Sequence, residues 1–258
     1  MAHKARKRFG QNFLHDPHVI DKIVRAVSPK KDQHLVEIGP GQGAITAHLL
    51  DSGAKLDAIE LDRDLVTLLA QKYAHINRFQ LHSADALKFY FCELKQTDAK
   101  LRIVGNLPYN ISTPLLFHLL DDAHCLHDMH FMLQKEVVER MAAAPGSKTY
   151  GRLSVMLQAY CKVQMLFPIG PGAFQPAPKV DSAFVRLVPY QELPVAINNP
   201  AVFSKVVAQA FSQRRKTLRN TLKELVSPES MLDCNIAPST RAEQLSVADF
   251  CCLSNAIS

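Results

Sequence analysis

The chain has 258 residues, a formal net charge of +6 and 47% hydrophobic residues. This length and composition predict a globular protein of one or two domains with a sizeable core. A run of about eighteen apolar residues is absent, which excludes a transmembrane helix, and the basic N-terminus leads into polar sequence, so we expect no secretory signal. Six cysteines without a Cys-x-x-Cys pair predict reduced thiols in a cytoplasmic protein.

Strand and helix patterns alternate along residues 17–189. We expect the first helix to run from Pro17 to about Val27 behind an Asp16 cap. Repeated strand–helix units after it favour a parallel sheet covered by helices. The expected strands are 34–38, 55–61, 78–83, 101–106, 130–134, 163–169 and 183–189, the last two as a closing antiparallel pair. The expected helices are 44–51, 62–73, 112–120 with a Ser112 cap, 135–143 and 152–161.

The alternation stops at residues 189–200, which are rich in Pro and Asn. Only helical patterns follow, and the last of them begins with a capping-box sequence, Ser246 and Asp249. We therefore predict an α/β domain over residues 1–190 and a small all-helical domain over residues 191–258. The helices expected in the second domain are 201–211, 213–226 and 246–257.

Positive charge is concentrated in two stretches. Residues 1–31 hold eight Lys or Arg against two Asp, and residues 201–225 hold six against Glu224. Each stretch is either solvated surface or a surface that contacts a polyanion. Two such stretches on either side of a candidate catalytic domain favour nucleic acid as the binding partner. A helix over 213–226 would align three cations on one face, with two more beside them, as a stripe for phosphates or as a solvated helix face. These cations are Arg214, Arg215, Lys216, Arg219 and Lys223.

A glycine-rich loop joins the strand 34–38 to the helix 44–51 and contains Gly39, Gly41 and Gly43. Glycine lets the backbone turn tightly and approach a ligand without a Cβ in the way. Such loops bind dinucleotides or S-adenosylmethionine (SAM), or they are plain turns.

Acidic residues around this loop favour SAM. Glu60 lies at the end of the next strand, where a carboxylate can accept hydrogen bonds from both ribose hydroxyls. Asp85 follows the third strand and either accepts from the adenine amino group or caps a helix. Glu37, two residues before the first glycine, is more typical of SAM binders than of nicotinamide binders.

The segment 105–112, GNLPYNIS, follows the fourth strand. An adenine amino nitrogen is a poor nucleophile, and an enzyme that methylates it must hold both N–H groups. The Asn106 side-chain oxygen and the Leu107 carbonyl can each accept one of them, and Pro108 stiffens the turn. Tyr109 offers a ring face on which the target base can stack. Alone the segment is also compatible with a surface turn, but its place after the glycine loop favours adenine methylation by positioning and electrostatics.

Taken in order, these motifs resemble the ribosomal RNA adenine dimethyltransferase family, and within it the bacterial small-subunit (16S) branch. The resemblance covers almost the whole chain. The segments that carry it are RKRFGQNFL (6–14), VEIGPGQGAIT (36–46), AIELDRDL (58–65), ADAL (84–87), NLPYNIS (106–112), FQPAPKVDSAFVRL (174–187) and FSQRRKTLRN (211–220).

The resemblance implies a Rossmann-like class I SAM-dependent methyltransferase domain, with a mostly parallel seven-stranded sheet and an antiparallel last strand, followed by a small all-helical RNA-contacting domain. It implies dimethylation of two adjacent adenines in the 3′-terminal hairpin of 16S rRNA during small-subunit assembly, by a monomer without a metal. It also implies that Phe174 stacks on the target base opposite Tyr109. Without the resemblance, FQPAP (174–178) is only a Pro-stiffened loop whose aromatic ring is equally compatible with the core. The SAM contacts would be Asn12, Leu14, Gly39, Gly41, Glu60, Asp85 and Asn106.

Two other functions remain open at this stage. A 23S rRNA adenine methylase of the antibiotic-resistance type shares the N-terminal motifs, and the segment 211–220 favours the small-subunit enzyme instead. A non-catalytic RNA-binding assembly or transcription factor on the same fold is disfavoured by the intact Glu60, Asp85, Asn106 and Tyr109. A metal is not expected, because the cluster of three histidines and one cysteine matches no common zinc spacing. That cluster is His124, Cys125, His127 and His130.

Overall fold

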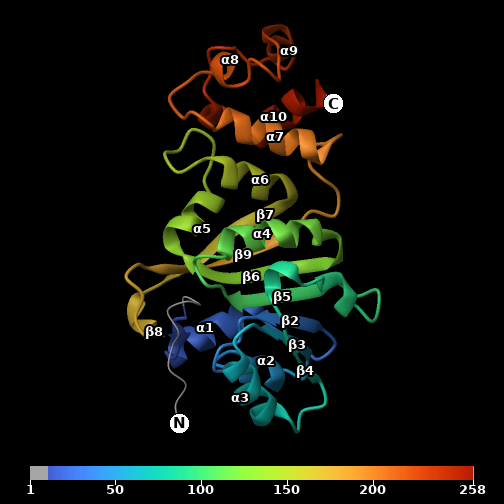
Figure 1. The fold of residues 1–258 in the computed structure, drawn as a ribbon, viewed down its shortest axis with the longest axis vertical. Helices are drawn as coiled ribbons and strands as arrows, with labels where there is room; N and C mark the ends of the chain where they lie inside the picture. The colour runs from blue at the N-terminus through green and yellow to red at the C-terminus, as the bar shows by residue number, and fades with distance from the viewer. Residues whose placement is uncertain (1–10, 258) are drawn as a thin grey trace. The chain divides into compact units, whose positions relative to one another are not determined.

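The computed structural model describes residues 11–257 and divides them into two compact units (Figure 1). The first unit combines residues 11–138 with Gln164–Pro189, and the second combines Glu139–Val163 with residues 190–257. The last point at which the chain passes from one unit to the other, between Pro189 and Tyr190, coincides with the boundary expected near residue 190. The segment Glu139–Val163, expected in the first domain, lies in the second unit. The division of catalysis and RNA contact between residues 1–190 and 191–258 stays a prediction.

A seven-stranded sheet dominates the first unit, in the strand order β4-β3-β2-β5-β6-β9-β7. All seven strands were expected from the apolar runs, and β6 begins four residues earlier than predicted. The strands are β2 (His34–Ile38), β3 (Lys55–Glu60), β4 (Phe79–Ser83), β5 (Leu101–Asn106), β6 (Leu126–Gln134), β7 (Cys161–Ile169) and β9 (Ser182–Pro189).

Parallel pairing brings the ends of the inner strands to one edge of this sheet. β2 pairs in parallel with β3 and β5, β3 pairs with β4, and β5 pairs with β6. Ile38 at the end of β2 is opposite Ile59 on one side and Gly105 on the other. β9, the last strand in the chain, pairs antiparallel with β6 and lies between β6 and β7. The predicted sheet, mostly parallel with an antiparallel last strand, is confirmed.

Helices follow the strands as the alternation predicted. α2 packs against β3, and α3 packs against β3 and β4 (Figure 1). The Asp16 side chain caps the first helix by accepting from the N–H groups of His18 and Val19. The predicted Ser112 cap is wrong, because Ile111 holds the cap position and the Ser112 hydroxyl donates to the Tyr109 carbonyl. The helices of this part of the chain are α1 (Pro17–Val27), α2 (Thr46–Asp51), α3 (Arg63–Tyr73), α4 (Ser112–Asp121) and α5 (Lys135–Met141).

A buried arginine ties the first helix to the middle of the sheet. Arg102 on β5 donates from Nε and Nη2 to the two carboxylate oxygens of Asp128 on β6, at 2.8 and 3.0 Å. Its Nη2 also donates to the carbonyl of Val27, the last residue of α1, at 2.7 Å. Because the guanidinium has several partners, burial of its charge is compensated. Arg102 therefore links the C-terminal end of α1 to the two central strands β5 and β6.

The second unit is helical, and α6 packs against α7 and α10. This packing explains why residues 139–163 belong to it. The predicted capping box is present, since Ser246 accepts from the Asp249 N–H and the Asp249 carboxylate accepts from the Ser246 N–H. The helices are α6 (Arg152–Tyr160), α7 (Pro200–Ala210), α8 (Leu218–Thr221), α9 (Pro228–Asp233) and α10 (Val247–Asn255).

The helix predicted over 213–226 is wrong. Only Leu218–Thr221 is helical, and Thr217 before it has extended backbone. The N–H groups of Leu218 and Arg219 donate to the carbonyls of Thr240 and Pro238, so tertiary contacts replace the preceding helical turn. The single-helix stripe of cations, which needed this helix, is therefore also wrong.

The cysteines differ from the prediction of six reduced thiols. Cys92 pairs with Cys125, and Cys234 pairs with Cys252, with Cα–Cα separations of 5.7 and 5.9 Å. Those separations lie in the range that a disulfide spans. The pairs are 33 and 18 residues apart in sequence, so the spacing pattern could not reveal them.

Candidate active site

The glycine-rich loop leads from β2 towards α2 at the carboxyl edge of the sheet. Gly39 and Gly41 have φ angles of +67° and +59°, in the left-handed region that favours glycine. A Cβ on Gly41 would lie 3.1 Å from a ring carbon of Phe13. The loop therefore presents backbone where a side chain would fill the space.

Two buried carboxylates flank this loop. Glu60 Oε1 accepts from the N–H groups of Leu61 and Asp62, both at 2.9 Å, and its Oε2 accepts from Gly41 at 3.3 Å. Burial raises the pKa of Glu60 although these N–H groups oppose the shift. Burial also raises the pKa of Glu37 to about 7, and Thr46 Oγ1 donates to its carboxylate at 2.6 Å. Desolvated carboxylates of this kind favour a cationic or hydroxyl-bearing ligand.

The segment 106–109 is fixed at several points beside the loop. Asn106, the last residue of β5, donates from Nδ2 to the Asn12 carbonyl at 3.0 Å. The Leu107 N–H donates to the Met132 carbonyl at 3.2 Å. These bonds hold the turn that was expected to carry the acceptors for an amino group.

An N-terminal strap, residues 11–15, crosses the site and pairs with a distant loop. Its strand β1 (Phe13–Leu14) forms a two-stranded antiparallel sheet with β8 (Phe174–Gln175). The His15 N–H donates to the Ala173 carbonyl at 3.0 Å. At the other end, Gln11 Nε2 donates to Asp62 Oδ2 at 3.0 Å. The strap therefore links the glycine-loop side of the site to the loop at residues 173–175.

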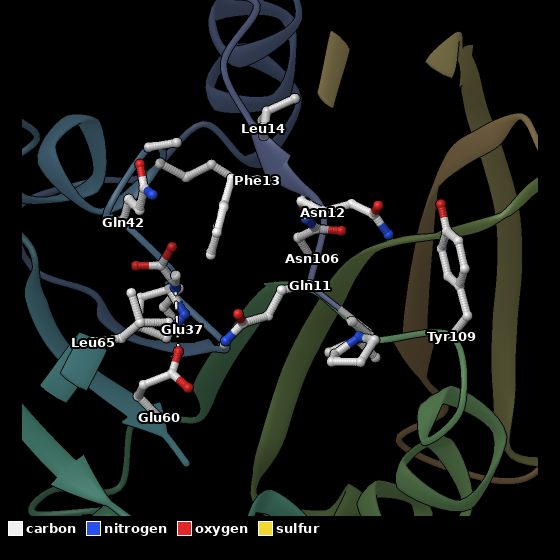
Figure 2. Close-up of a pocket in the computed structure, with 17 residues that line it drawn as sticks. Gln11, Asn12, Phe13, Leu14, Glu37, Gln42, Glu60, Leu65, Asn106 and Tyr109 are labelled. Atoms are coloured by element: carbon white, nitrogen blue, oxygen red, sulfur yellow. Dashed lines mark hydrogen bonds between the residues drawn. The ribbon is translucent and has the colours of Figure 1, made fainter. Parts of the chain in front are cut away.

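These elements enclose one pocket, which Figure 2 shows with the carboxylates on one side and Tyr109 on the other. The strap residues and Asn106 lie between them in that view. The pocket is lined by Gln11, Asn12, Phe13, Leu14, Glu37, Gly39, Pro40, Gly41, Gln42, Ala44, Ile45, Glu60, Leu65, Asn106, Leu107, Pro108 and Tyr109.

Most of the residues expected in the catalytic and cofactor sites come together at this pocket. They derive from four separate stretches of the chain, which meet because strands β2, β3 and β5 end at the same edge. The expected residues found in its lining are Asn12, Leu14, Gly39, Gly41, Glu60, Asn106, Leu107, Pro108 and Tyr109.

Two expected residues lie outside the lining. Asp85 caps the short helix Ala86–Lys88, its Oδ1 accepting from the Leu87 N–H at 3.0 Å, which was the alternative interpretation of this residue. Phe174 is 2% exposed and belongs to the same buried cluster as Leu14. Its ring is therefore covered in this conformation, and its stacking on a base stays a prediction.

Several lining residues were missed by the sequence analysis. Gln11 and Phe13 lie inside a segment that only the resemblance indicated. Gln42 lies in the glycine-rich loop and Leu65 on the following α3, and neither side chain was expected to face the pocket. Gly105, next to the lining residue Asn106 but not itself in the lining, carried a usable signal, since a glycine inside a strand indicates close approach of another backbone. An added Cβ there would lie 2.5 Å from the Ile38 carbonyl oxygen.

The expected RNA-contacting cations lie in the second unit and are exposed. Arg214 is engaged within that unit, pairing with Glu243 at 3.4 Å and donating to the Lys148 carbonyl. Lys4, Arg6, Lys7 and Arg8 of the first basic stretch lie outside the described residues.

Residues 11–257 contain no group of three or more His, Cys, Asp or Glu side chains arranged to hold a metal ion. In the same part of the chain, no helix has the length and apolar character needed to cross a membrane.

The strand order and the glycine-loop pocket define a Rossmann-like class I methyltransferase. The family model described as Ribosomal RNA adenine dimethylase matches residues 2–258. The chain belongs to this family and is a ribosomal RNA adenine dimethyltransferase.

Curated relatives support this assignment over nearly the whole chain. A Pseudomonas aeruginosa protein named Ribosomal RNA small subunit methyltransferase A is 59% identical over 253 residues, covering 98% of this chain and 94% of that protein. A Hahella chejuensis protein of the same name is 57% identical over 250 residues, covering 97% and 92%.

Solved structures share the fold. A dimethyladenosine transferase from Plasmodium falciparum superposes with a TM-score of 0.81 at 27% identity, covering 93% of this chain and 95% of that one. The 23S rRNA methyltransferase ErmE has a TM-score of 0.73 at 22% identity, covering 95% and 99%, and supports the fold alone.

Replacing Gly105 with alanine tests the close approach of β5 to β2. The new Cβ meets backbone rather than a flexible side chain, so we expect Gly105→Ala to lower the free energy of unfolding by about 2–3 kcal/mol. Urea denaturation followed by circular dichroism measures this. The matched control is Gly172→Ala, where nothing lies within 4 Å of the added Cβ. Equal stability of the two variants would contradict the contact.

Proposed function

We propose that the pocket binds SAM and that the enzyme transfers its methyl groups to two adjacent adenines of small-subunit (16S) rRNA. The observation that carries this proposal is the meeting of the glycine-loop pocket with Asn106–Tyr109 at one sheet edge. The 57–59% identity to proteins named Ribosomal RNA small subunit methyltransferase A supports the choice of RNA. A 23S substrate has no comparable support, because ErmE, at 22% identity, shares only the fold.

The residues present fit SAM. Gly39 and Gly41 contribute backbone to the pocket wall, and the Glu60 carboxylate in the same wall suits the ribose hydroxyls. Glu37 is a buried carboxylate suited to a ligand with cationic groups. The strap residues Asn12 and Leu14 cover the ligand. When bound, SAM supplies a methyl group activated on a sulfonium.

Asp85 extends the proposed cofactor site to the adenine ring. Its Oδ1 is engaged by the Leu87 N–H, and we assign Oδ2 to the adenine amino group of SAM. This role is compatible with the capping role, because a carboxylate has two oxygens and can accept at both.

The target adenine is held by the segment 106–109. The Asn106 side-chain oxygen and the Leu107 carbonyl accept its two N–H groups, while the Tyr109 ring stacks on the base. With SAM bound, these contacts would aim the amino nitrogen at the methyl carbon, so that the N–C bond could form as the C–S bond breaks with its electrons left on sulfur and one N–H proton is lost to solvent. For Phe174 to stack on the same base, β8 must move so that its covered ring becomes exposed.

The RNA backbone is contacted by Arg214, Arg215, Lys216, Arg219 and Lys223. Because no single helix spans these residues, the cations lie on a loop and a short helix and do not form a stripe. We place the enzyme in the cytoplasm as a monomer, acting on RNA within an assembling small subunit. A non-catalytic scaffold role is disfavoured by the intact pocket.

A tritium-transfer assay tests the proposed function. The full chain is incubated with methyl-tritiated SAM and with undermethylated small subunits or large-subunit RNA. We expect tritiated dimethyladenosine at two neighbouring positions of the small-subunit RNA. Product only on large-subunit RNA would support the 23S alternative, and no product on either would support the scaffold role.

Removing the Asn106 amide tests the hold on the amino group. We expect Asn106→Ala to lower kcat by about a thousandfold, because a fixed polar partner in the transition state is lost. SAM affinity should fall no more than about tenfold, the effect of losing one hydrogen bond to the strap. Methyl transfer and calorimetric SAM binding are measured side by side. The control is Asn77→Ala in an exposed loop, and near-normal kcat for Asn106→Ala would remove Asn106 from the mechanism.

The raised pKa of Glu37 predicts a pH dependence of SAM binding. Below a pKa of about 7 the carboxyl is neutral, and above it the carboxylate attracts the cationic ligand, so SAM affinity should rise about three- to tenfold from pH 6 to pH 8. Glu37→Gln should flatten this rise in titration calorimetry. S-adenosylhomocysteine, which lacks the sulfonium charge, should show a smaller rise with the unmodified protein. An unchanged slope in Glu37→Gln would exclude this role.

Charge reversal tests the RNA contacts. We expect the double variant Arg215→Glu/Arg219→Glu to weaken RNA binding and to reduce the slope of log affinity against log salt by about 1.5, with SAM binding unchanged. Filter binding over a salt series measures both quantities. Lys88→Glu/Lys100→Glu makes the same charge change at exposed positions elsewhere. Equal effects of the two double variants would show that these arginines act only through net charge.

A further inference from the structure

A serine on the antiparallel strand contacts the proposed base-stacking ring. Tyr109 Oη and Ser182 Oγ share a hydrogen bond of 2.8 Å, although the two residues are 73 positions apart in sequence. Ser182 is fully buried, with 0% of its surface exposed. A buried hydroxyl is stabilised only when it is hydrogen-bonded, so the Tyr109 contact accounts for a polar side chain at this position.

The backbone holds Ser182 firmly. It is the first residue of β9 and is opposite Gln134, the last residue of β6. One position earlier, the Asp181 carbonyl accepts from the Lys135 N–H at 2.9 Å. The hydroxyl therefore projects from a fixed point of the sheet.

Tyr109 is held at both of its ends. Its carbonyl accepts from Ser112 Oγ at 3.1 Å, and its hydroxyl meets Ser182. Burial raises the pKa of the Tyr109 hydroxyl, so the group stays protonated and can share this hydrogen bond. A tyrosine ring anchored at its backbone and at its tip has little freedom to rotate. Figure 2 shows this ring on the side of the pocket opposite Glu60.

We propose that Ser182 is a positioning residue, whose hydroxyl fixes the Tyr109 ring in the orientation that stacks on the target adenine. The inference rests on the proposed role of Tyr109. A positioning role for Ser182 differs from a role in packing, because an alanine at position 182 would fill the space about as well but could not hold the Tyr109 hydroxyl. Orientation of a reacting group affects the rate of the chemical step more than the binding of a cofactor at the other side of the pocket.

A double-mutant cycle tests the proposal. Ser182→Ala and Tyr109→Phe each remove one partner of the same hydrogen bond, and we expect each to lower kcat about five- to tenfold with the KM for SAM unchanged. The double variant should be no slower than the slower single variant, since the bond is already lost. Ser52→Ala is the matched control, because its hydroxyl donates to the Leu49 carbonyl within α2 and its neighbouring turn. Combined with Tyr109→Phe, it should show no coupling.

The outcomes separate this inference from the proposed function. If the unmodified enzyme methylates RNA but Ser182→Ala has normal kcat, or if the two changes multiply in the double variant, the positioning role is overturned. A failure of the unmodified enzyme to methylate overturns the proposed function instead. Should Ser182→Ala fail to fold, Ser182→Cys keeps a side chain of similar shape with a weak hydrogen-bonding group, and the same cycle is run with it. A rise in the KM for SAM without a change in kcat would also contradict the proposal.

Discussion

The active site depends on how closely β5 approaches β2 at the sheet edge. Gly105 is opposite Ile38, and the Ile38 carbonyl oxygen occupies the space that a Cβ at position 105 would need. One residue further, the Asn106 carbonyl oxygen lies 3.6 Å from the position of a Cβ on Gly39. Gly105 on β5 and Gly39 just after β2 thus allow the glycine-rich loop and the segment 106–109 to share one wall. Methyl transfer requires donor and acceptor within reach of each other, and in the proposed function this contact brings the two binding sites together.

The N-terminal strap makes the two halves of the pocket depend on each other. Asn12 accepts from the Asn106 side chain, and the next two residues form the β1–β8 pairing with the loop that carries Phe174. A rearrangement that uncovers the Phe174 ring must therefore disturb the ladder that holds Leu14. In the proposed mechanism, the cover of the cofactor and the second stacking ring belong to one structural element, and their positions are coupled.

The sequence was sufficient where the signal is local. Strand ends, the glycine loop and the turn at Pro108 follow from apolar runs and turn residues, so the sheet and the two walls of the pocket at the glycine loop and at 106–109 were predicted. The strap residues Asn12 and Leu14 came only from the resemblance. The helix expected over 213–226 is not present, although the residue spacing there is typical of a helix. The Leu218 N–H donates to the Thr240 carbonyl, a partner that a local spacing pattern cannot reveal. Partners distant in sequence, such as Tyr109 with Ser182 or Cys92 with Cys125, leave no local pattern. Phe174 had an aromatic signal in a stiff loop, but only packing could reveal that its ring is covered.

The loss of the predicted basic helix changes how RNA recognition should be understood. A regular stripe would set one register on the RNA backbone, whereas cations on a loop and a four-residue helix can adjust to the phosphates they meet. Arg214 is already engaged by Glu243 and by the Lys148 carbonyl, so it contributes less to such adjustment than its exposed neighbours. Phosphate contacts carry no sequence information. In the proposed function, selection of the two adenines would therefore come from RNA shape and from the pocket that would accept an everted base.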